Sequence, residues 1–398
     1  MIRIASPVIE KKDGYIYVTS HIVDEIQGLD MIAWYRSDLE YGQYFNDDVL
    51  DAFVLPMLLC GIKYKEDIEI EGFISEKLYY NIKNNLIYTL SIPFHLERLI
   101  EVRCKGTKVM NYTPAAVGCG CSLGVDSFSA MLRHFSPDCP DGFKITHLTN
   151  FNIGAYGNDF EKGHESYLKA LESVREFSEN EGFPLVLVES NMGAFFKEQT
   201  FNWSGPVRTM STALSMQKLF RRYYYASGHN NADIEITDIM GHFASLVIPM
   251  FSTENIEFIV ADQDRSRVEK TIAIADNPLT QKYLHVCLRE IRANNQGKEY
   301  LRDVKFRNCT RCDKCWRTLI TLDVLGLTEK YKGIFDVDYF YSIKDSIIED
   351  VVINRDNNLF KNEIYQLMIE RNYEIPARIL RKSRINQFKK LLKSKFVK

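Results

Sequence analysis

The sequence predicts an α/β protein built on a parallel sheet with helices on both faces. From Ala115 onward, short apolar runs with the composition of strands alternate with longer stretches of helical periodicity. Parallel strands need long connections, which helices usually provide. A turn of small residues, GCGCSLGVDS at 118–127, lies between the first of these strands and the first helix. Ligands of such folds bind at this end of the strands, so the turn is the first candidate site.

Three parts are expected along the 398 residues. Residues 1–112 mix strand and helix patterns and are expected to form an N-terminal α+β module. Residues 113–335 carry the regular alternation, and residues 336–398 form a helical C-terminal extension. The extension ends in a segment with nine basic and no acidic residues. A solvent-facing amphipathic helix accounts for this charge, and an anionic partner such as nucleic acid is the alternative.

Each element is predicted from its periodicity and its flanking turn residues. In the N-terminal module, strands are expected over 15–23 and 31–37, and helices over 47–62 and 75–90, with Ser75 as an N-cap. In the α/β domain, strands are expected over 115–121, 144–153, 183–190, 221–227 and 256–261, with helices over 126–135, 165–182 and 210–220.

Composition narrows the class of protein. Hydrophobic residues make up 45% and charged residues 26%, as in ordinary soluble domains, and the net charge of −3 gives no drive toward nucleic acid or membranes. The start has no signal-peptide pattern, and no run of about 18 apolar residues exists, so we expect no membrane partner. Three of the nine cysteines fall within 309–315, which favours a metal over disulfides and a cytoplasmic location.

Two readings of the small-residue turn are weak. A dinucleotide loop, G-x-G-x-x-G, would need glycine at position 123, where the chain has Leu123. A nucleophile elbow, G-x-S-x-G, matches GCSLG and would make Ser122 an acylated nucleophile. It would need an acid and a base, for which Asp238 with His242 or His285 are the available residues, and nothing else in the sequence marks them.

A phosphate-binding loop explains the turn better. Small residues let backbone N–H groups turn toward an anion, and the following helix N-terminus adds positive potential. Ser122 and Ser127 are expected to bind phosphate oxygens, and Asp126 to hold Mg²⁺ or cap the helix. The predicted nucleotide-binding residues are Ser122, Leu123, Gly124, Val125, Asp126 and Ser127.

The cysteines of NCTRCDKCWRT predict a metal site. Cys309, Cys312 and Cys315 are spaced C-x-x-C-x-x-C, which lets successive thiolates face one ion. Cys287 is the preferred fourth ligand and His285 the fallback. Four protein ligands would close a tetrahedral zinc site and make it structural, whereas an iron–sulfur cluster fits the same letters less well.

Together, SLGVDS at 122–127 and the late C-x-x-C-x-x-C-x-R resemble the PP-loop N-type ATP pyrophosphatases. Within that superfamily the chain is most similar to 7-cyano-7-deazaguanine synthase of the queuosine pathway, over about residues 115–325. Leu123 replaces the glycine usual in SGGxDS, and Arg317 matches the arginine after the last cysteine. The extra residues at both ends suggest a larger, diverged member of the kind found in bacterial antiviral defence clusters.

The resemblance implies a Rossmann-like, adenine nucleotide alpha-hydrolase-like fold and the cofactors ATP, Mg²⁺ and Zn²⁺. It implies a ligase reaction in which ATP adenylates a carboxylate, expected to be a 7-carboxy-7-deazaguanine, with release of pyrophosphate. An amine then displaces AMP to give an amide, and a second activation can give the nitrile. The acceptor amine stays open between ammonia, a small metabolite and a protein partner, and the chain is either a monomer or a homodimer.

Further residues are assigned by position. Arg267 and Lys270 lie three apart on a helix predicted after the fifth strand, so they are expected to act on the α-phosphate or the substrate carboxylate as catalytic residues. Surface charges beside Glu269 are the alternative. Asn150, at the end of the second strand, is expected near adenine. His242 either lines the acceptor pocket or is a satisfied structural histidine.

Three other functions stay open. A tRNA-modifying thiolase of the same superfamily would need a reactive cysteine pair, for which only Cys119 and Cys121 are placed. A serine hydrolase would use Ser122. A non-catalytic nucleotide-binding module is suggested by Leu123 in the loop.

Overall fold

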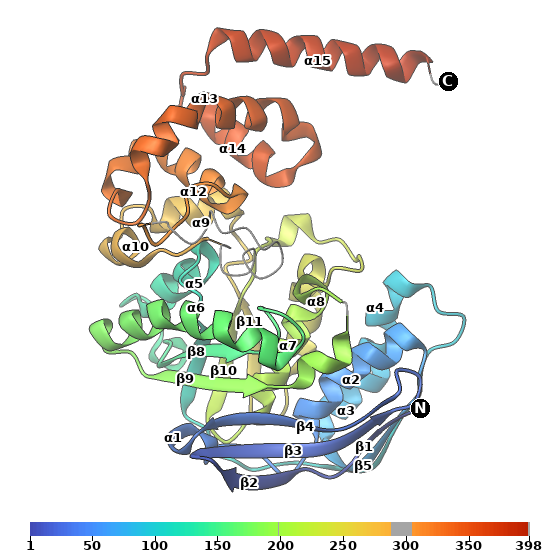
Figure 1. Ribbon diagram of the computed structural model, residues 1–398. Helices are drawn as coiled ribbons and strands as arrows, with labels where there is room; N and C mark the ends of the chain where they lie inside the picture. The colour runs from blue at the N-terminus through green and yellow to red at the C-terminus, as the bar shows by residue number, and fades with distance from the viewer. Residues whose placement is uncertain (198, 288–304, 397–398) are drawn as a thin grey trace. The chain divides into compact units, whose positions relative to one another are not determined.

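The computed structural model describes residues 1–197, 199–287 and 305–396 (Figure 1). The chain forms two compact units. Unit 1 comprises Met1–Ser122 with Ala130–Asp264, and unit 2 comprises Leu123–Ser129 with Arg265–Lys398. The boundary expected at residue 112 therefore falls inside unit 1, and the one expected at 335 falls inside unit 2.

Unit 1 contains one large mixed sheet. The described residues place eleven strands in it, in the order β11-β10-β7-β8-β9-β4-β3-β1-β5-β6, with β2 paired to β3. The neighbours from β11 to β9 are parallel, as the alternation predicted. The strands are β1 Ile2–Ile4, β2 Val8–Lys12, β3 Tyr15–Asp24, β4 Leu29–Asp38, β5 Ile68–Ser75, β6 Val102–Lys108, β7 Ala116–Gly120, β8 His147–Asn152, β9 Leu185–Ser190, β10 Phe220–Ala226 and β11 Glu257–Ala261.

The N-terminal strands continue the parallel sheet. Strand β4 runs antiparallel to β9, with Tyr35 opposite Ser190 and Arg36 opposite Glu189. Side chains extend this short pairing: the Asn191 carboxamide accepts from the backbone N–H of Trp34 at 2.8 Å and donates to the carbonyl of Ile32 at 2.9 Å. The unpaired edge that β9 would otherwise present is covered, which explains why residues 1–112 belong to unit 1.

Helices cover the two faces of this sheet. Val186 and Val188 of β9 belong to a core shared with α2 and α7, whereas the alternate residue Glu189 points to the opposite face, over which α6 packs. Figure 1 shows α6 crossing β8 and β9. The helices of unit 1 are α1 Leu39–Gly42, α2 Asp51–Tyr64, α3 Glu76–Asn81, α4 Ile87–Ser91, α6 Phe160–Glu181, α7 Phe201–Ser215 and α8 Ala244–Val247.

The described residues of unit 2 form helices and loops. Helix α5, Val125–Phe135, begins in unit 2 and its last turns belong to unit 1. The other helices described in unit 2 are α9 Arg267–Ile274, α10 Pro278–Tyr283, α12 Asp313–Val324, α13 Val337–Asn354, α14 Leu359–Glu370 and α15 Ala377–Phe396. Residues 336–396, where a helical extension is predicted, contain α13, α14 and α15.

One local prediction was wrong, and another was confirmed in position only. The helix expected over 210–220 instead begins at Phe201 and ends at Ser215, because Phe220 already pairs with Ala116 in the sheet. Ser75 occupies the N-cap position of α3, but its hydroxyl donates to the Asp51 carboxylate and makes no cap hydrogen bond.

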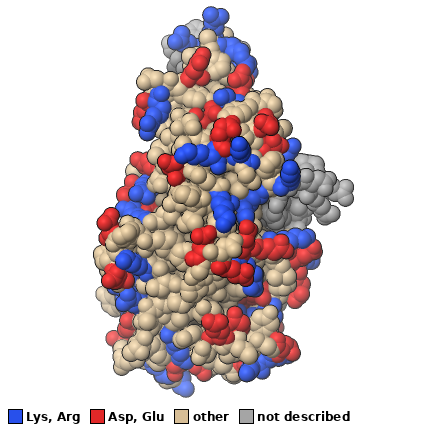
Figure 2. Space-filling model, turned by 90° about the vertical axis from the view of Figure 1, so that its left-hand side faces the viewer, with Lys and Arg blue, Asp and Glu red and all other residues tan. Residues whose placement is uncertain are grey.

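Surface charge and hydropathy fit the composition. Figure 2 shows Lys and Arg interspersed with Asp and Glu on the face that it presents. Among the helices of the described residues, none combines the length and apolarity needed to cross a membrane.

Asp51 supplies a stability test, because it is fully buried at the start of α2. It accepts from the Ser75 backbone N–H at 2.8 Å, from the Ser75 hydroxyl, and from the Gln217 carboxamide at 2.7 Å. Asp51→Ala would leave three buried donors unsatisfied and should lower the free energy of unfolding by about 3–5 kcal/mol in urea titration. Asp30→Ala, which removes an exposed pair with His21, should change it by less than about 0.5 kcal/mol.

Candidate functional site

The turn predicted to bind phosphate joins β7 to α5. Leu123 has φ +55°, the left-handed conformation that glycine adopts without strain, and its side chain is completely buried. The carbonyl of Leu123 accepts from the His285 backbone N–H at 2.8 Å. The backbone thus has a conformation that glycine adopts more easily, and burial of the leucine side chain offsets the conformational cost.

The first turn of α5 is held by local contacts. The Gly124 carbonyl accepts from the Phe128 backbone N–H at 3.0 Å and from the Ser127 hydroxyl at 3.2 Å. Asp126 lies within this turn and does not cap it; its Oδ2 is 2.9 Å from Nη2 of Arg267 on α9. Its other oxygen, Oδ1, is buried without a hydrogen-bond partner among the described residues. Asp126 therefore retains an oxygen that a cation could bind.

Three cations of unit 2 lie around Asp126. Arg267 comes from α9, while Lys314 and Arg317 lie three apart on the first turns of α12. Burial, and next the charge of Arg267, lower the pKa of Lys314 and of Arg317. In the described part of the chain neither of these two residues forms an ion pair with a carboxylate. The result is a partly buried positive region beside the loop, which an anion would neutralise.

Helix α14 supports this group of cations. The guanidinium of Arg317 lies 4.3 Å from the ring centre of Phe360, and that of Arg267 lies 5.7 Å from the same ring. One turn later, the Glu363 carboxylate accepts from the backbone N–H of Val268 at 3.1 Å, at the start of α9. The C-terminal extension therefore orients both arginines.

The other predicted residues are placed as follows. Lys270 is on α9 as predicted but is completely buried, so it is not a surface charge. Ser122 is exposed at the end of β7 in unit 1, and the Asn150 carboxamide donates to the carbonyl of Cys121 at 2.9 Å. His242 lies 2.9 Å from the Thr237 hydroxyl, which agrees with a satisfied histidine. The roles of Ser122, Asn150, Arg267 and Lys270 stay predictions.

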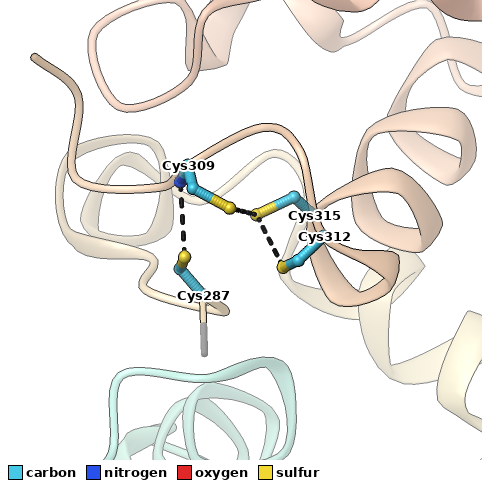
Figure 3. A group of neighbouring side chains, drawn as sticks. All are labelled: Cys287, Cys309, Cys312 and Cys315. Carbon is cyan, nitrogen blue, oxygen red and sulfur yellow. Dashed lines mark hydrogen bonds between the residues drawn. The ribbon is translucent and has the colours of Figure 1, made fainter. Parts of the chain in front are cut away.

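The four predicted metal-ligating cysteines come together in unit 2 (Figure 3). Their sulfur atoms all lie within 4.8 Å of one another, and Cys309, Cys312 and Cys315 are buried. Sulfur separations of 3.5 Å for Cys312–Cys315 and 3.9 Å for Cys309–Cys315 are close to the roughly 3.8 Å of a tetrahedron with metal–sulfur bonds of about 2.3 Å. The arrangement fits a closed zinc site.

The four thiols differ in acidity: hydrogen bonds among them raise the pKa of Cys287 and of Cys315 and lower that of Cys309 and of Cys312. The Arg311 backbone N–H points to Cys309 Sγ at 3.4 Å, and the Cys309 backbone N–H points to Cys287 Sγ at the same distance. A hydrogen bond from the Cys287 thiol lowers the pKa of Cys309 to about 7, and the same neighbour lowers the pKa of Cys312 far more. Zinc needs deprotonated thiols, so metal binding would release the protons that Cys287 and Cys315 retain.

Asn308 fixes the two segments that carry the cysteines. Its side chain is fully buried, accepts from the Val286 backbone N–H at 2.8 Å and donates to the Leu284 carbonyl at 2.8 Å. The segment that ends at Cys287 is therefore bonded both to Asn308 and, through the His285 backbone N–H, to the loop at Leu123. The predicted metal ligands and the predicted phosphate loop are thus joined by backbone hydrogen bonds.

Sequence reasoning missed Lys314 and Phe360. Lys314 could have been found, because it lies three residues before Arg317 and both follow the cysteine turn. Phe360 gave no such signal, since one aromatic residue on a distant helix is indistinguishable from a packing residue.

No family model, curated protein or solved structure matches this chain.

Metal content tests the cysteine cluster. The protein purified without chelator should contain about one zinc per chain by elemental analysis, and Cys312→Ser should lose most of it because three ligands bind far less tightly. Cys139→Ser, outside the cluster, is the matched control. Lowering the pH should release the metal, since protons compete for the thiolates. Iron with visible absorption would instead indicate an iron–sulfur cluster.

The left-handed backbone at Leu123 gives a second test. Leu123→Ala loses buried contacts and keeps the strained φ, so it should lower the free energy of unfolding by about 2–4 kcal/mol. Leu123→Gly loses more side chain but relieves about 1 kcal/mol of backbone strain. We therefore expect glycine to be no more destabilising than alanine, as measured by thermal and urea unfolding. A clearly less stable glycine variant would contradict the assignment of strain.

Proposed function

We propose that this protein is an ATP-dependent, carbon–nitrogen bond-forming enzyme of the PP-loop type, which adenylates a carboxylate and transfers the acyl group to an amine. One observation carries the proposal: Lys314 and Arg317, two partly buried cations without carboxylate ion pairs in the described residues, lie beside the loop that begins at Leu123. A triphosphate supplies the negative charge that such a group requires.

In this proposal the residues of unit 2 have separate roles in phosphate binding and charge neutralisation. Backbone N–H groups at the start of α5 bind the β- and γ-phosphates, with Ser127 close to them. Arg267, Lys314 and Arg317 neutralise charge that develops as pyrophosphate leaves the α-phosphate. The carboxylate substrate attacks that phosphorus, so no protein nucleophile is needed, and the protein's contribution is position and charge. A 7-carboxy-7-deazaguanine is the substrate suggested by the family resemblance.

The two metals have separate roles in the proposal. Asp126 Oδ1, buried and without a hydrogen-bond partner in the described residues, would hold Mg²⁺, which neutralises phosphate charge when bound. The four cysteines would hold Zn²⁺ in a site with no open position, and its contribution is structural. That contribution places the first turn of α12, from which Lys314 and Arg317 extend.

Of the other functions, the thiolase fits the structure less well. A thiolase needs a reactive thiol, yet Cys119 and Cys121 are buried, and burial raises the pKa of the Cys119 thiol. A non-catalytic nucleotide-binding module would bind ATP at the same cations, so activity must separate it from the enzyme.

ATP–pyrophosphate exchange tests the proposal. Exchange should depend on one member of a panel of carboxylates that includes 7-carboxy-7-deazaguanine. Lys314→Gln and Arg317→Gln should each reduce exchange about 10- to 100-fold, since a hydrogen bond to a charged group contributes about 1.5–3 kcal/mol. Lys332→Gln, an exposed lysine of the same unit, should leave the rate within twofold.

Binding and turnover together decide between the alternatives. Folded, zinc-loaded protein that binds ATP but shows no exchange with any acid would contradict adenylation and favour the non-catalytic module. Labelling of Ser122 by an active-site serine probe would favour the hydrolase.

A further inference from the structure

A pocket of about 510 Å³ lies in unit 1, and the residues that line it all belong to that unit. Its walls come from strand β4, from the start of helix α6 and from the segment that follows β9. Two aromatic side chains line it, and Trp34 and Phe160 contact each other edge to face with ring centres 5.0 Å apart. Three charged residues, Asp159, Glu161 and Lys197, line it as well. A pocket of this size holds a small molecule.

Lys197 has a backbone conformation that normally requires glycine. Its φ is +43° and its ψ is −117°, outside the regions that other residues adopt without strain. The Asn158 carboxamide holds this conformation, because its Nδ2 donates to the Lys197 carbonyl and, at 2.9 Å, to the Gln199 carbonyl. Strained residues of this kind persist where the surrounding structure imposes them, and they gather at ligand sites. The lysine side chain is therefore expected to have a role that glycine could not supply.

A buried arginine fixes Asn158 in turn. Arg208 of α7 is 2% exposed, and its Nη1 donates to Asn158 Oδ1 at 2.7 Å and to the Ile153 carbonyl at 3.1 Å. In the part of the chain that the structure describes, Arg208 has no carboxylate partner, and burial lowers its pKa to about 9. A buried charge without a counter-ion destabilises a fold, so its presence here agrees with a functional role. Arg208 is a positioning residue that acts through Asn158 on Lys197.

The pocket carries charges of both signs. Lys197 Nζ donates to the Gln27 carbonyl at 3.0 Å, which leaves the other N–H groups of the ammonium for a ligand. Asp159 caps α6 and pairs with the exposed Lys162 at 2.8 Å. Among the residues that the structure describes, neither Lys197 nor Glu161 forms an ion pair. One cation and one carboxylate thus line the same pocket without partners, a pattern that suits a zwitterion.

We propose that this pocket binds a free α-amino acid with an apolar or aromatic side chain, whose carboxylate contacts Lys197 and whose ammonium group contacts Glu161. The side chain of the ligand packs against Trp34 and Phe160. A simple carboxylate would leave Glu161 without a cation, and a simple amine would leave Lys197 without an anion, so both would bind less tightly. The proposal uses none of the residues assigned to the reaction above and does not depend on that reaction.

Arg36 decides which part of the ligand meets the aromatic rings. Its guanidinium lies 5.3 Å from the ring centre of Trp34 and 5.2 Å from that of Phe160. A cation already lies at these rings, so a second cation there is disfavoured. The ammonium group of the ligand therefore goes to the carboxylate of Glu161, and the apolar part of the ligand goes to the rings.

Ligand binding to the full-length protein tests the proposal. The common L-amino acids, at concentrations up to about 10 mM, are screened for a rise in melting temperature, because a ligand of the native state stabilises it. Isothermal titration calorimetry then gives the affinity of those that bind, and an apolar or aromatic amino acid should bind most tightly. The matching amine and acid, phenethylamine and hydrocinnamate in the case of phenylalanine, should each bind about 10- to 100-fold more weakly, since each lacks one charged contact.

Two substitutions of Lys197 separate binding from stability. Lys197→Gln keeps the strained backbone and removes the charge, so it should weaken binding about 10- to 100-fold. Lys197→Gly should also lose binding, yet should not lower the melting temperature of the unliganded protein, because glycine adopts this backbone without strain. Glu161→Gln should weaken binding about 10-fold. Lys169→Gln, which removes an exposed lysine further along α6, is the matched control and should leave the affinity within about twofold.

The outcomes distinguish a ligand site from a structural lysine. Absence of binding by every amino acid would overturn the proposal, and so would an amine or an acid analogue that binds as tightly as the amino acid. Binding that survives Lys197→Gln would place the ligand elsewhere and overturn the assignment of Lys197. A melting temperature that falls by more than about 3 °C in Lys197→Gly would show that the lysine serves stability rather than binding.

Discussion

Four sulfur atoms within 4.8 Å of one another form the constraint on which unit 2 depends. Thiolates this close repel one another unless a cation lies among them. A hydrogen bond from the Cys287 thiol already lowers the pKa of Cys309. The cluster fixes the start of α12, because Cys312 is its N-cap and Cys315 lies in its first turn. Lys314 and Arg317 owe their position to that turn. A metal bound by the cysteines would thus affect the proposed reaction only indirectly, through the positions of Lys314 and Arg317.

The loop predicted to bind phosphate is attached to the same framework. The backbone hydrogen bond from His285 to Leu123 and the side chain of Asn308 connect the loop, the segment of Cys287 and the segment of Cys309. From the opposite side, Phe360 and Glu363 of α14 contact Arg317 and the first turn of α9. The C-terminal extension therefore contacts the cation group and helps to hold it in position.

Unit 1 joins parallel and antiparallel strands in one sheet. The antiparallel pairing of β4 with β9 brings Arg36 beside Glu189. Without β4, strand β9 and its Glu189 would lie at an exposed edge of the parallel strands. The N-terminal strands thereby complete a polar row at the carboxyl edge of the parallel strands. The carboxylate in this row also contacts His164 of α6, at 2.9 Å.

The sequence by itself determined the parallel strands from β7 to β11, the four cysteines and the phosphate-loop candidate, because each depends on residues close together in the chain. Cys287 was predicted as the fourth metal ligand because few other cysteines lie in the second half of the chain. Only the tertiary structure decided the rest: that residues 1–112 continue the sheet, that Leu123 takes a left-handed backbone, that Phe360 contacts two arginines, and that Glu189 meets Arg36 and His164. These contacts join residues far apart in sequence, and no local periodicity or spacing records which distant side chains will meet.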